Sequence, residues 1–152
     1  MRLESPAFAG GTTIPSRYTA DGEDVSPPLA WGEIPPDSKA LAILVEDPDA
    51  PRGSFDHWLA WNIVPTQREL AEDAVHAPDG RGLREGRNGF GTVGWRGPQP
   101  PPGRPHHYVF HLFALDQPLA LRPGAGRSEL ERAMRGHVID EARLVGMYGT
   151  GE

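Results

Sequence analysis

The sequence LAILVEDPDAP at residues 41–51, followed by HWLAWNI at residues 57–63, decides the fold of this chain. The apolar run at 41–45 is short and rich in Ile, Leu and Val, which is typical of a buried strand. Pro48 and Pro51 disfavour a helix after it, because proline lacks a backbone N–H and keeps the preceding residue extended. The stretch therefore predicts two neighbouring strands joined by a stiff loop that carries Asp47 and Asp49.

Length and composition indicate one β-rich domain. A chain of 152 residues is long enough for one hydrophobic core and short for two, so we expect a single domain over residues 1–152. Its 19 glycines and 17 prolines are spread between short apolar runs. Because both residue types end regular elements, this distribution predicts a mainly β fold of short strands and turns.

Charge and cysteine content exclude several classes of function. The formal net charge of -6 argues against a nucleic-acid-binding protein, which would present a basic face. The chain has no cysteine, which excludes disulfides, a thiol nucleophile and a thiolate metal site. Residues 1–6 contain no apolar segment of the kind found in a secretory signal, so we expect a cytoplasmic protein.

The remaining elements are predicted from apolar periodicity and turn residues. We expect short strands at 5–8 and 29–31, a helical turn at 67–73, and longer strands at 106–115 and 138–148. A helix is expected after Ser128, since Ser128 and Glu131 have the spacing of a capping box.

Strict alternation of side chains assigns the residues of two strands to faces. In 57–63 it separates two sets: His57, Leu59, Trp61 and Ile63 on one face, and Trp58, Ala60 and Asn62 on the other. In 106–115 it places His106 and Tyr108 together and puts His107 and His111 on the opposite face. His106 and His111 therefore cannot belong to one site.

Asp47, Asp49, His57 and His106 form the candidate site. A carboxylate close to an imidazole favours the charged ring, and a protonated histidine supplies donors to an anion. The carboxylates would repel that anion, so we expect them to accept from the far ring nitrogens and orient the histidines. The candidate site is thus predicted to bind a small anion.

Three other interpretations of these residues remain open. The aspartates can cap turns while the histidines pack in the core. Two Asp and two His are also a plausible ligand set for zinc or iron, although no pair on one element has the spacing of metal ligands. A hydrolase would need a nucleophile, for which Ser54 and Ser26 are available without an elbow-type context.

Two separated motifs resemble a known family. Asp47-Pro48-Asp49-Ala50-Pro51 with His57-Trp58, and Gly97-Pro98 with a proline-rich loop leading into His106-His107-Tyr108, are similar to the two signature regions of the phosphatidylethanolamine-binding protein family. The closer likeness is to its bacterial Raf-kinase-inhibitor-like branch. The resemblance implies a fold of two antiparallel β-sheets, a β-sandwich, with a few short helices.

The resemblance also implies a pocket for phosphate-like or carboxylate anions. Carried over position by position, its lining would be Asp47, Asp49, His57, Gly97, His106 and Tyr108, with Pro48, Pro98 and Arg96 shaping its walls and mouth. Arg96 stands where the family commonly has glycine. His107 replaces an arginine of the second motif, so we expect an outer-face ion pair to be lost while anion binding is kept.

Family members act chiefly as modulators of kinases, proteases or signalling complexes and need no cofactor or metal. The resemblance therefore implies an anion-binding modulator with a kinase or protease partner, and it makes a homodimer plausible. A membrane lipid headgroup is a less favoured ligand, since the sequence stops soon after Tyr148 and lacks the helix that borders the pocket in eukaryotic members. The alternatives are an Asp/His-assisted hydrolase of phosphorylated or ester substrates and an inhibitor that acts through its outer loops.

Overall fold

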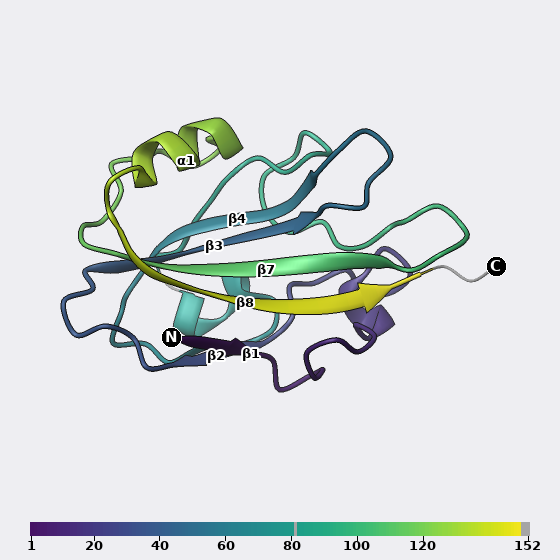
Figure 1. Ribbon diagram of the computed structural model, residues 1–152, viewed down its shortest axis with the longest axis horizontal. Coiled ribbons are helices and arrows are strands. Elements are labelled where there is room, and N and C mark those ends of the chain that lie inside the picture. The colour runs from purple at the N-terminus through teal and green to yellow at the C-terminus, as the bar shows by residue number, and fades with distance from the viewer. Residues whose placement is uncertain (81, 150–152) are drawn as a thin grey trace.

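Two antiparallel sheets make up the computed structural model, which describes residues 1–80 and 82–149 (Figure 1). The smaller sheet has the order β1 (Arg2–Glu4), β2 (Leu29–Gly32), β5 (Glu69–Leu70). The larger sheet has the order β6 (Arg84–Glu85), β4 (Phe55–Ile63), β3 (Ala40–Asp47), β7 (His106–Leu115), β8 (Val138–Tyr148). The described residues add the helix α1 (Arg127–Met134) and short 3-10 turns at Ser16–Tyr18, Ala74–His76 and Pro78–Gly80. The predicted mainly β fold of two antiparallel sheets is confirmed.

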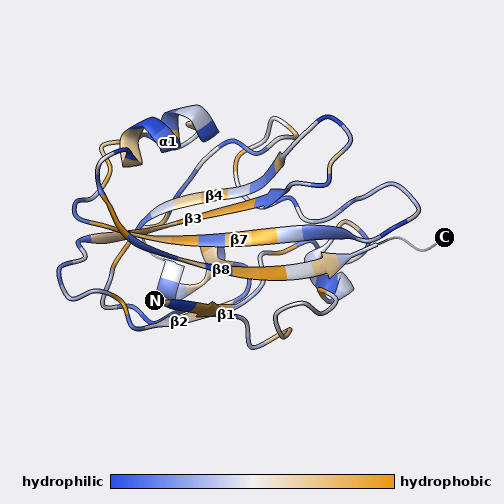
Figure 2. Cartoon of the chain, viewed as in Figure 1, coloured by the Kyte–Doolittle hydropathy of each residue, from blue (hydrophilic) through white to orange (hydrophobic). Residues whose placement is uncertain are grey.

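The large sheet is buried on both faces. One face packs against the small sheet, with Ile43, Val45 and Phe110 in the main hydrophobic cluster. The other face packs under α1, where Leu44 and Trp61 belong to a second cluster. Burial on both sides explains why residues 41–45 are apolar without alternation. Figure 2 shows the apolar residues gathered along β3, β4 and β7, while α1 and the loops carry most of the polar ones.

Several predicted elements are confirmed and two are wrong. The strands at 106–115, 138–148 and 29–31 are present as β7, β8 and part of β2, and the second central strand begins at Phe55. The segment 5–8 is no strand, and the N-terminal strand is β1 instead. The predicted helical turn at 67–73 is wrong because β5 pairs with β2 there and buries Leu70 in the core.

The helix begins earlier than its sequence signal indicates. Gly126 is the N-cap, and its backbone N–H donates to the Glu129 carboxylate at 3.0 Å. Glu131, expected to complete a capping box with Ser128, instead accepts from Arg127 at 3.2 Å. The predicted capping box is therefore wrong. Within the described part of the chain, α1 included, no helix has the length and apolar character to cross a membrane.

Two irregularities in β4 change which side chains share a face. Val45 lies opposite Trp58 but Glu46 lies opposite Asp56, so His57 has no partner in the ladder and forms a β-bulge. The bulge brings His57 to the Tyr108 side of the sheet, with ring centroids 5.3 Å apart. Asn62 has a φ of 59°, and after it Ile63 joins the cluster of Trp58 and Ala60. The face predicted for His57 and Ile63 by strict alternation is therefore wrong.

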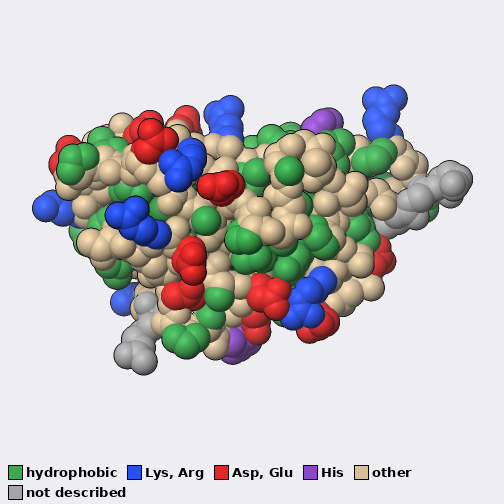
Figure 3. Space-filling view, turned by 90° about the horizontal axis from the view of Figure 1, so that it is seen from below, with side chains coloured by type: hydrophobic (Ala, Val, Ile, Leu, Met, Phe, Trp, Pro, Cys, Tyr) green, Lys and Arg blue, Asp and Glu red, His purple; other side chains and the backbone are tan. Residues whose placement is uncertain are grey.

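Charges are mixed on the molecular surface seen in Figure 3. On that face, the Asp and Glu side chains lie among Arg and Lys side chains, and apolar side chains lie between them. A broad basic patch, as nucleic acid requires, is not seen on this face.

Candidate functional site

A cavity of about 180 Å³ opens where β3 ends and where β4 and β7 begin. Antiparallel pairing brings these three strand ends to one edge of the large sheet, although they are far apart in the sequence. The proline-rich loop before β7 and the loop around Phe90 complete the walls. The lining residues are Asp47, Ala50, Pro51, Phe55, His57, Phe90, Gln99, Pro100, Pro101, His106 and Tyr108.

A buried aspartate orients the first histidine of the cavity. Asp47 is 4% exposed, and one of its carboxylate oxygens lies 2.6 Å from His106 Nδ1. The other oxygen accepts the backbone N–H of Asp49 at 2.8 Å, which fixes the turn after β3. Because the carboxylate only accepts, Nδ1 donates and Nε2 is the His106 nitrogen left for a ligand. This agrees with the orienting role expected for Asp47.

The second histidine is held by the backbone rather than by a carboxylate. His57 Nδ1 lies 2.6 Å from the Arg96 carbonyl oxygen, and the His57 carbonyl accepts the Arg96 N–H at 3.1 Å. Burial lowers the pKa of His57, against the raising effects of the Arg96 carbonyl and the Asp47 charge. At neutral pH the His57 ring is therefore uncharged, with a proton on Nδ1 and an acceptor at Nε2. The lowered pKa argues against a charged donor at His57 in the ligand-free protein, so the donor role expected for His57 stays a prediction.

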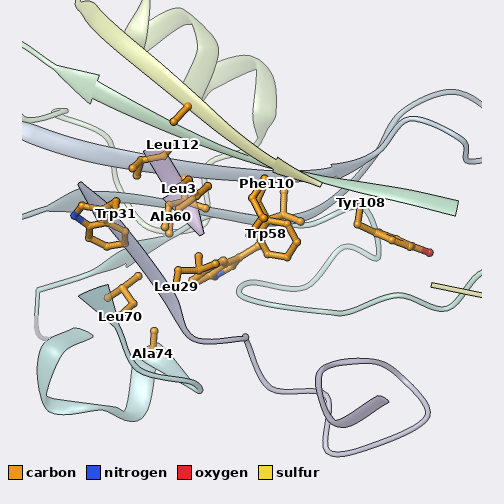
Figure 4. Close-up of a cluster of buried hydrophobic side chains, with 14 of the residues drawn as sticks. Leu3, Leu29, Trp31, Trp58, Ala60, Leu70, Ala74, Tyr108, Phe110 and Leu112 are labelled. Atoms are coloured by element: carbon orange, nitrogen blue, oxygen red, sulfur yellow. The ribbon is translucent and has the colours of Figure 1, made fainter. Parts of the chain in front are cut away.

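Tyr108 supplies a hydroxyl without a hydrogen-bond partner. The residue is 1% exposed, and its oxygen has no partner in hydrogen-bonding geometry within residues 1–80 and 82–149. Burial and then the negative charges of Asp47 and Asp49 raise the pKa of the Tyr108 hydroxyl. The Asp47 carboxylate lies close enough to add to this effect, although the pair lacks hydrogen-bonding geometry, so the hydroxyl stays protonated and can donate. Figure 4 shows this hydroxyl pointing away from the buried cluster. A polar atom that is buried and lines a cavity is the kind of group that a ligand can satisfy.

Aromatic rings form the wall beside His57. Phe55 and Phe90 pack edge to face with centroids 4.8 Å apart, and the guanidinium of Arg96 lies 4.5 Å from the Phe90 centroid. Phe90 is 38% exposed and lines the cavity, which places it at the mouth, and Arg96 contacts this ring without lining the cavity itself. Arg96 has no ion pair with the residues that the structure describes, which leaves an unneutralised cation at the mouth.

Two of the predicted pocket residues lie outside the cavity. The Asp49 carboxylate accepts the backbone N–H of His107 and contacts His107 Nδ1, both at 2.7 Å, and these bonds lower the pKa of Asp49. The expected loss of an outer-face pair at His107 is therefore wrong. The N–H of Gly97 donates to Asp24 at 2.8 Å, so it is not available to a ligand.

Gly97 has a structural role close to the site. A Cβ added there would lie 2.2 Å from the Tyr18 carbonyl oxygen, which only glycine avoids. Pro48 and Pro98 do not line the cavity; Pro51, Pro100 and Pro101 do. The two aromatic wall residues were not predicted from the sequence, although Phe55 stands two residues before His57 and Phe90 lies in the glycine-rich segment 88–91.

The described residues are not arranged as a metal site or a serine hydrolase would require. No group of three or more His, Asp or Glu side chains is placed so that it could hold a metal ion, as judged over residues 1–80 and 82–149. Ser54 donates to Glu46 at 2.5 Å, and Ser26 accepts the backbone N–H of Ala74 at 3.1 Å. Neither serine lines the cavity, so a hydrolase would have to use a water molecule as nucleophile.

Comparison with known proteins identifies relatives of this fold and sequence. A UPF0098 protein of Methanothermobacter thermautotrophicus is 47% identical over 99% of this chain and 100% of its own. A UPF0098 protein of Aquifex aeolicus is 41% identical over 97% of this chain and 88% of its own.

Two solved structures are similar to this chain in both fold and sequence. A phosphatidylethanolamine-binding protein homolog of Chlamydia trachomatis has a TM-score of 0.90 at 36% identity, over 98% of this chain and 97% of its own. Escherichia coli YbcL, described as a member of the mammalian PEBP family, has a TM-score of 0.88 at 29% identity, over 97% of both chains. The family model described as phosphatidylethanolamine-binding protein matches residues 4–149, and the chain therefore belongs to the phosphatidylethanolamine-binding protein family.

Proposed function

We propose that the cavity binds a small oxyanion: phosphate, a phosphomonoester or a carboxylate. The observation that carries this proposal is the buried Tyr108 hydroxyl, which has no partner among the described residues and faces the same cavity as His57 and His106. Burying a hydroxyl without a hydrogen bond is unfavourable, and a ligand oxygen would remove that penalty.

Each polar group has a distinct part in binding. The Tyr108 hydroxyl donates a hydrogen bond to one ligand oxygen. The Nε2 atom of His106 contacts a second ligand oxygen, while His106 Nδ1 donates to Asp47 and so keeps the ring in place. His57 presents an acceptor at Nε2, because its ring proton is on Nδ1, which donates a hydrogen bond to the Arg96 carbonyl. An acceptor suits an oxyanion that still carries a proton, such as hydrogen phosphate. A fully deprotonated ligand would require His57 to gain a proton on binding.

The cavity limits the size of the buried group. A volume of about 180 Å³ corresponds to roughly six water molecules at the volume of each in the liquid. A phosphate or carboxylate group with a short attachment fits this space, while the rest of a larger ligand would leave through the mouth beside Phe90. The apolar walls strengthen the polar contacts because they keep the local dielectric low.

The experiment is a phosphate titration of metal-free protein, followed by NMR of the histidine rings. His106→Asn is the informative variant, since its amide can donate to Asp47 where Nδ1 does while Nε2 is lost. His137→Asn is the matched control, because His137 also pairs with an aspartate, Asp116, at 2.9 Å and does not line the cavity. We expect saturable shifts at His57 and His106 in the parent and the control, and at least tenfold weaker binding in His106→Asn. Equal binding by both variants would refute the site.

Hydrolysis is the second candidate function, and the Asp47 to His106 contact of 2.6 Å favours it. An imidazole oriented by a carboxylate can act as a general base toward water. Turnover of a phosphomonoester or ester that disappears in Asp47→Asn would support the enzyme. Saturable binding without turnover would support the binding protein.

We further propose that a protein partner, such as a kinase or protease, recognises the rim of the cavity. The exposed Phe90 with Arg96 stacked on it gives that rim an apolar and a cationic element in contact. An inhibitor that acts through other loops would keep its activity in Phe90→Ser and in His106→Asn, which distinguishes the two modes.

A further inference from the structure

A second cavity, of about 280 Å³, lies at the other end of the central strands. It is formed between the segment after β2 and the segment after β4, where β3 begins and β4 ends. Figure 4 shows Trp31, which lines this cavity, and Tyr108, which lines the first one, at opposite ends of the buried cluster. The two cavities share no lining residue, so they are separate sites.

Five of the nine residues that line the second cavity are apolar, and most of these are rigid. Trp31 is 4% exposed, and its indole N–H donates to the Gln67 carbonyl at 2.8 Å, which fixes the ring. The other apolar lining residues are Ile34, Pro35, Pro36 and Pro65. Proline and a fixed indole lose little conformational freedom when a flat apolar group packs on them, so the walls suit a ring.

Four polar residues complete the lining of the second cavity: Ser38, Thr66, Gln67 and Arg68. The Gln67 side-chain amide already donates to the carbonyls of Glu69 and Asp79, at 2.8 and 2.5 Å. Ser38 is 8% exposed, and its hydroxyl oxygen has no hydrogen-bond partner among the described residues. Arg68 is exposed and is the charged member of the lining; its guanidinium makes no hydrogen bond or ion pair that the described residues show. The cavity therefore combines a wall of Trp31, Ile34 and prolines with one unneutralised cation and one unsatisfied hydroxyl.

We propose that this cavity binds a small aromatic carboxylate. The ring packs on Trp31 and the prolines, the carboxylate pairs with the Arg68 guanidinium, and the Ser38 hydroxyl donates to a carboxylate oxygen. A guanidinium and a carboxylate have matching planar geometry, which favours a carboxylate over a compact tetrahedral anion. The volume, about nine water molecules at liquid volume, corresponds to a ligand of benzoate size. This site is independent of the function proposed for the first cavity.

Benzoate is the probe, and the Trp31 indole N–H is the reporter in a ¹⁵N NMR titration. Benzamide is the matched neutral compound, since it has the same shape without the charge. We expect benzoate to shift the Trp31 signal saturably and to bind roughly tenfold more tightly than benzamide, as loss of a charge-assisted pair implies. Tyr108→Phe, which alters the first cavity, should leave this binding unchanged.

Variants of the second cavity complete the test. Arg68→Gln should weaken benzoate binding roughly tenfold and remove the preference over benzamide, whereas Arg135→Gln, an exposed arginine outside the lining, should change neither. Ser38→Ala should weaken benzoate binding without loss of stability, because it removes an unpaired hydroxyl. Absence of a saturable Trp31 shift would overturn the proposal and leave a cavity that holds water only. Equal behaviour of Arg68→Gln and Arg135→Gln would overturn it as well.

Discussion

Replacing Tyr108 by phenylalanine should change stability and ligand binding in opposite directions. The hydroxyl is buried without a partner, a condition that costs about 1 to 3 kcal/mol and that phenylalanine removes while keeping the ring. We therefore expect Tyr108→Phe to raise the free energy of unfolding by about 1 kcal/mol. For a domain of this length, that corresponds to an increase in Tm of roughly 3 °C.

Tyr18 offers a control with the same chemical change. It is also buried, at 6% exposure, but its hydroxyl donates to the Glu72 carboxylate at 2.8 Å. Tyr18→Phe should therefore lower the free energy of unfolding by about 1 kcal/mol. Urea denaturation of both variants and the parent measures these changes, since a shift of the midpoint at constant slope reports stability.

The binding measurement gives the second half of this prediction. Phosphate affinity should fall roughly tenfold in Tyr108→Phe and stay unchanged in Tyr18→Phe, which does not line the cavity. If Tyr108→Phe lowered stability as much as Tyr18→Phe, the Tyr108 hydroxyl would have a structural partner. The Tyr108 hydroxyl would then not be a group that a ligand satisfies.

Four further results are expected. Because burial lowers the pKa of His57 below its unfolded value, stability should be complete above about pH 6.5 and should fall as the pH drops through that value toward the folded pKa, as thermal unfolding at stepped pH can show. We expect bound phosphate to raise the His57 pKa, because its negative charge favours the protonated ring, so calorimetric affinity should be highest at low pH and decline as the pH rises through the bound pKa. Gly97→Ala should lose more than about 2 kcal/mol in urea denaturation, since its Cβ would meet a carbonyl oxygen at 2.2 Å, whereas Gly10→Ala, with its nearest atom at 3.6 Å, should be nearly neutral. Arg96→Gln should weaken phosphate binding roughly threefold and reduce its salt dependence; an unchanged salt dependence would show that this cation plays no part in capture.

Local patterns in the sequence were sufficient for most strands. The apolar run at 41–45 and the alternation in 106–115 are properties of neighbouring residues. Such patterns predict a strand without information from the rest of the chain. The same alternation correctly puts His106 and Tyr108 on one face of β7. The helical turn expected at 67–73 failed because pairing with β2, a distant segment, decides the conformation there.

The sequence by itself determined which residue types the cavity contains, and the tertiary structure decided how they are used. The β-bulge at His57 depends on the register between β3 and β4, which sequence alternation does not specify. Asp47 meets His106 across 59 positions of sequence, while Asp49, two residues further on, faces His107 instead. The charge of His57 depends on burial by segments far along the chain. Propensity and periodicity are set by neighbours, but register, burial and hydrogen-bond partners arise only when distant segments pack together.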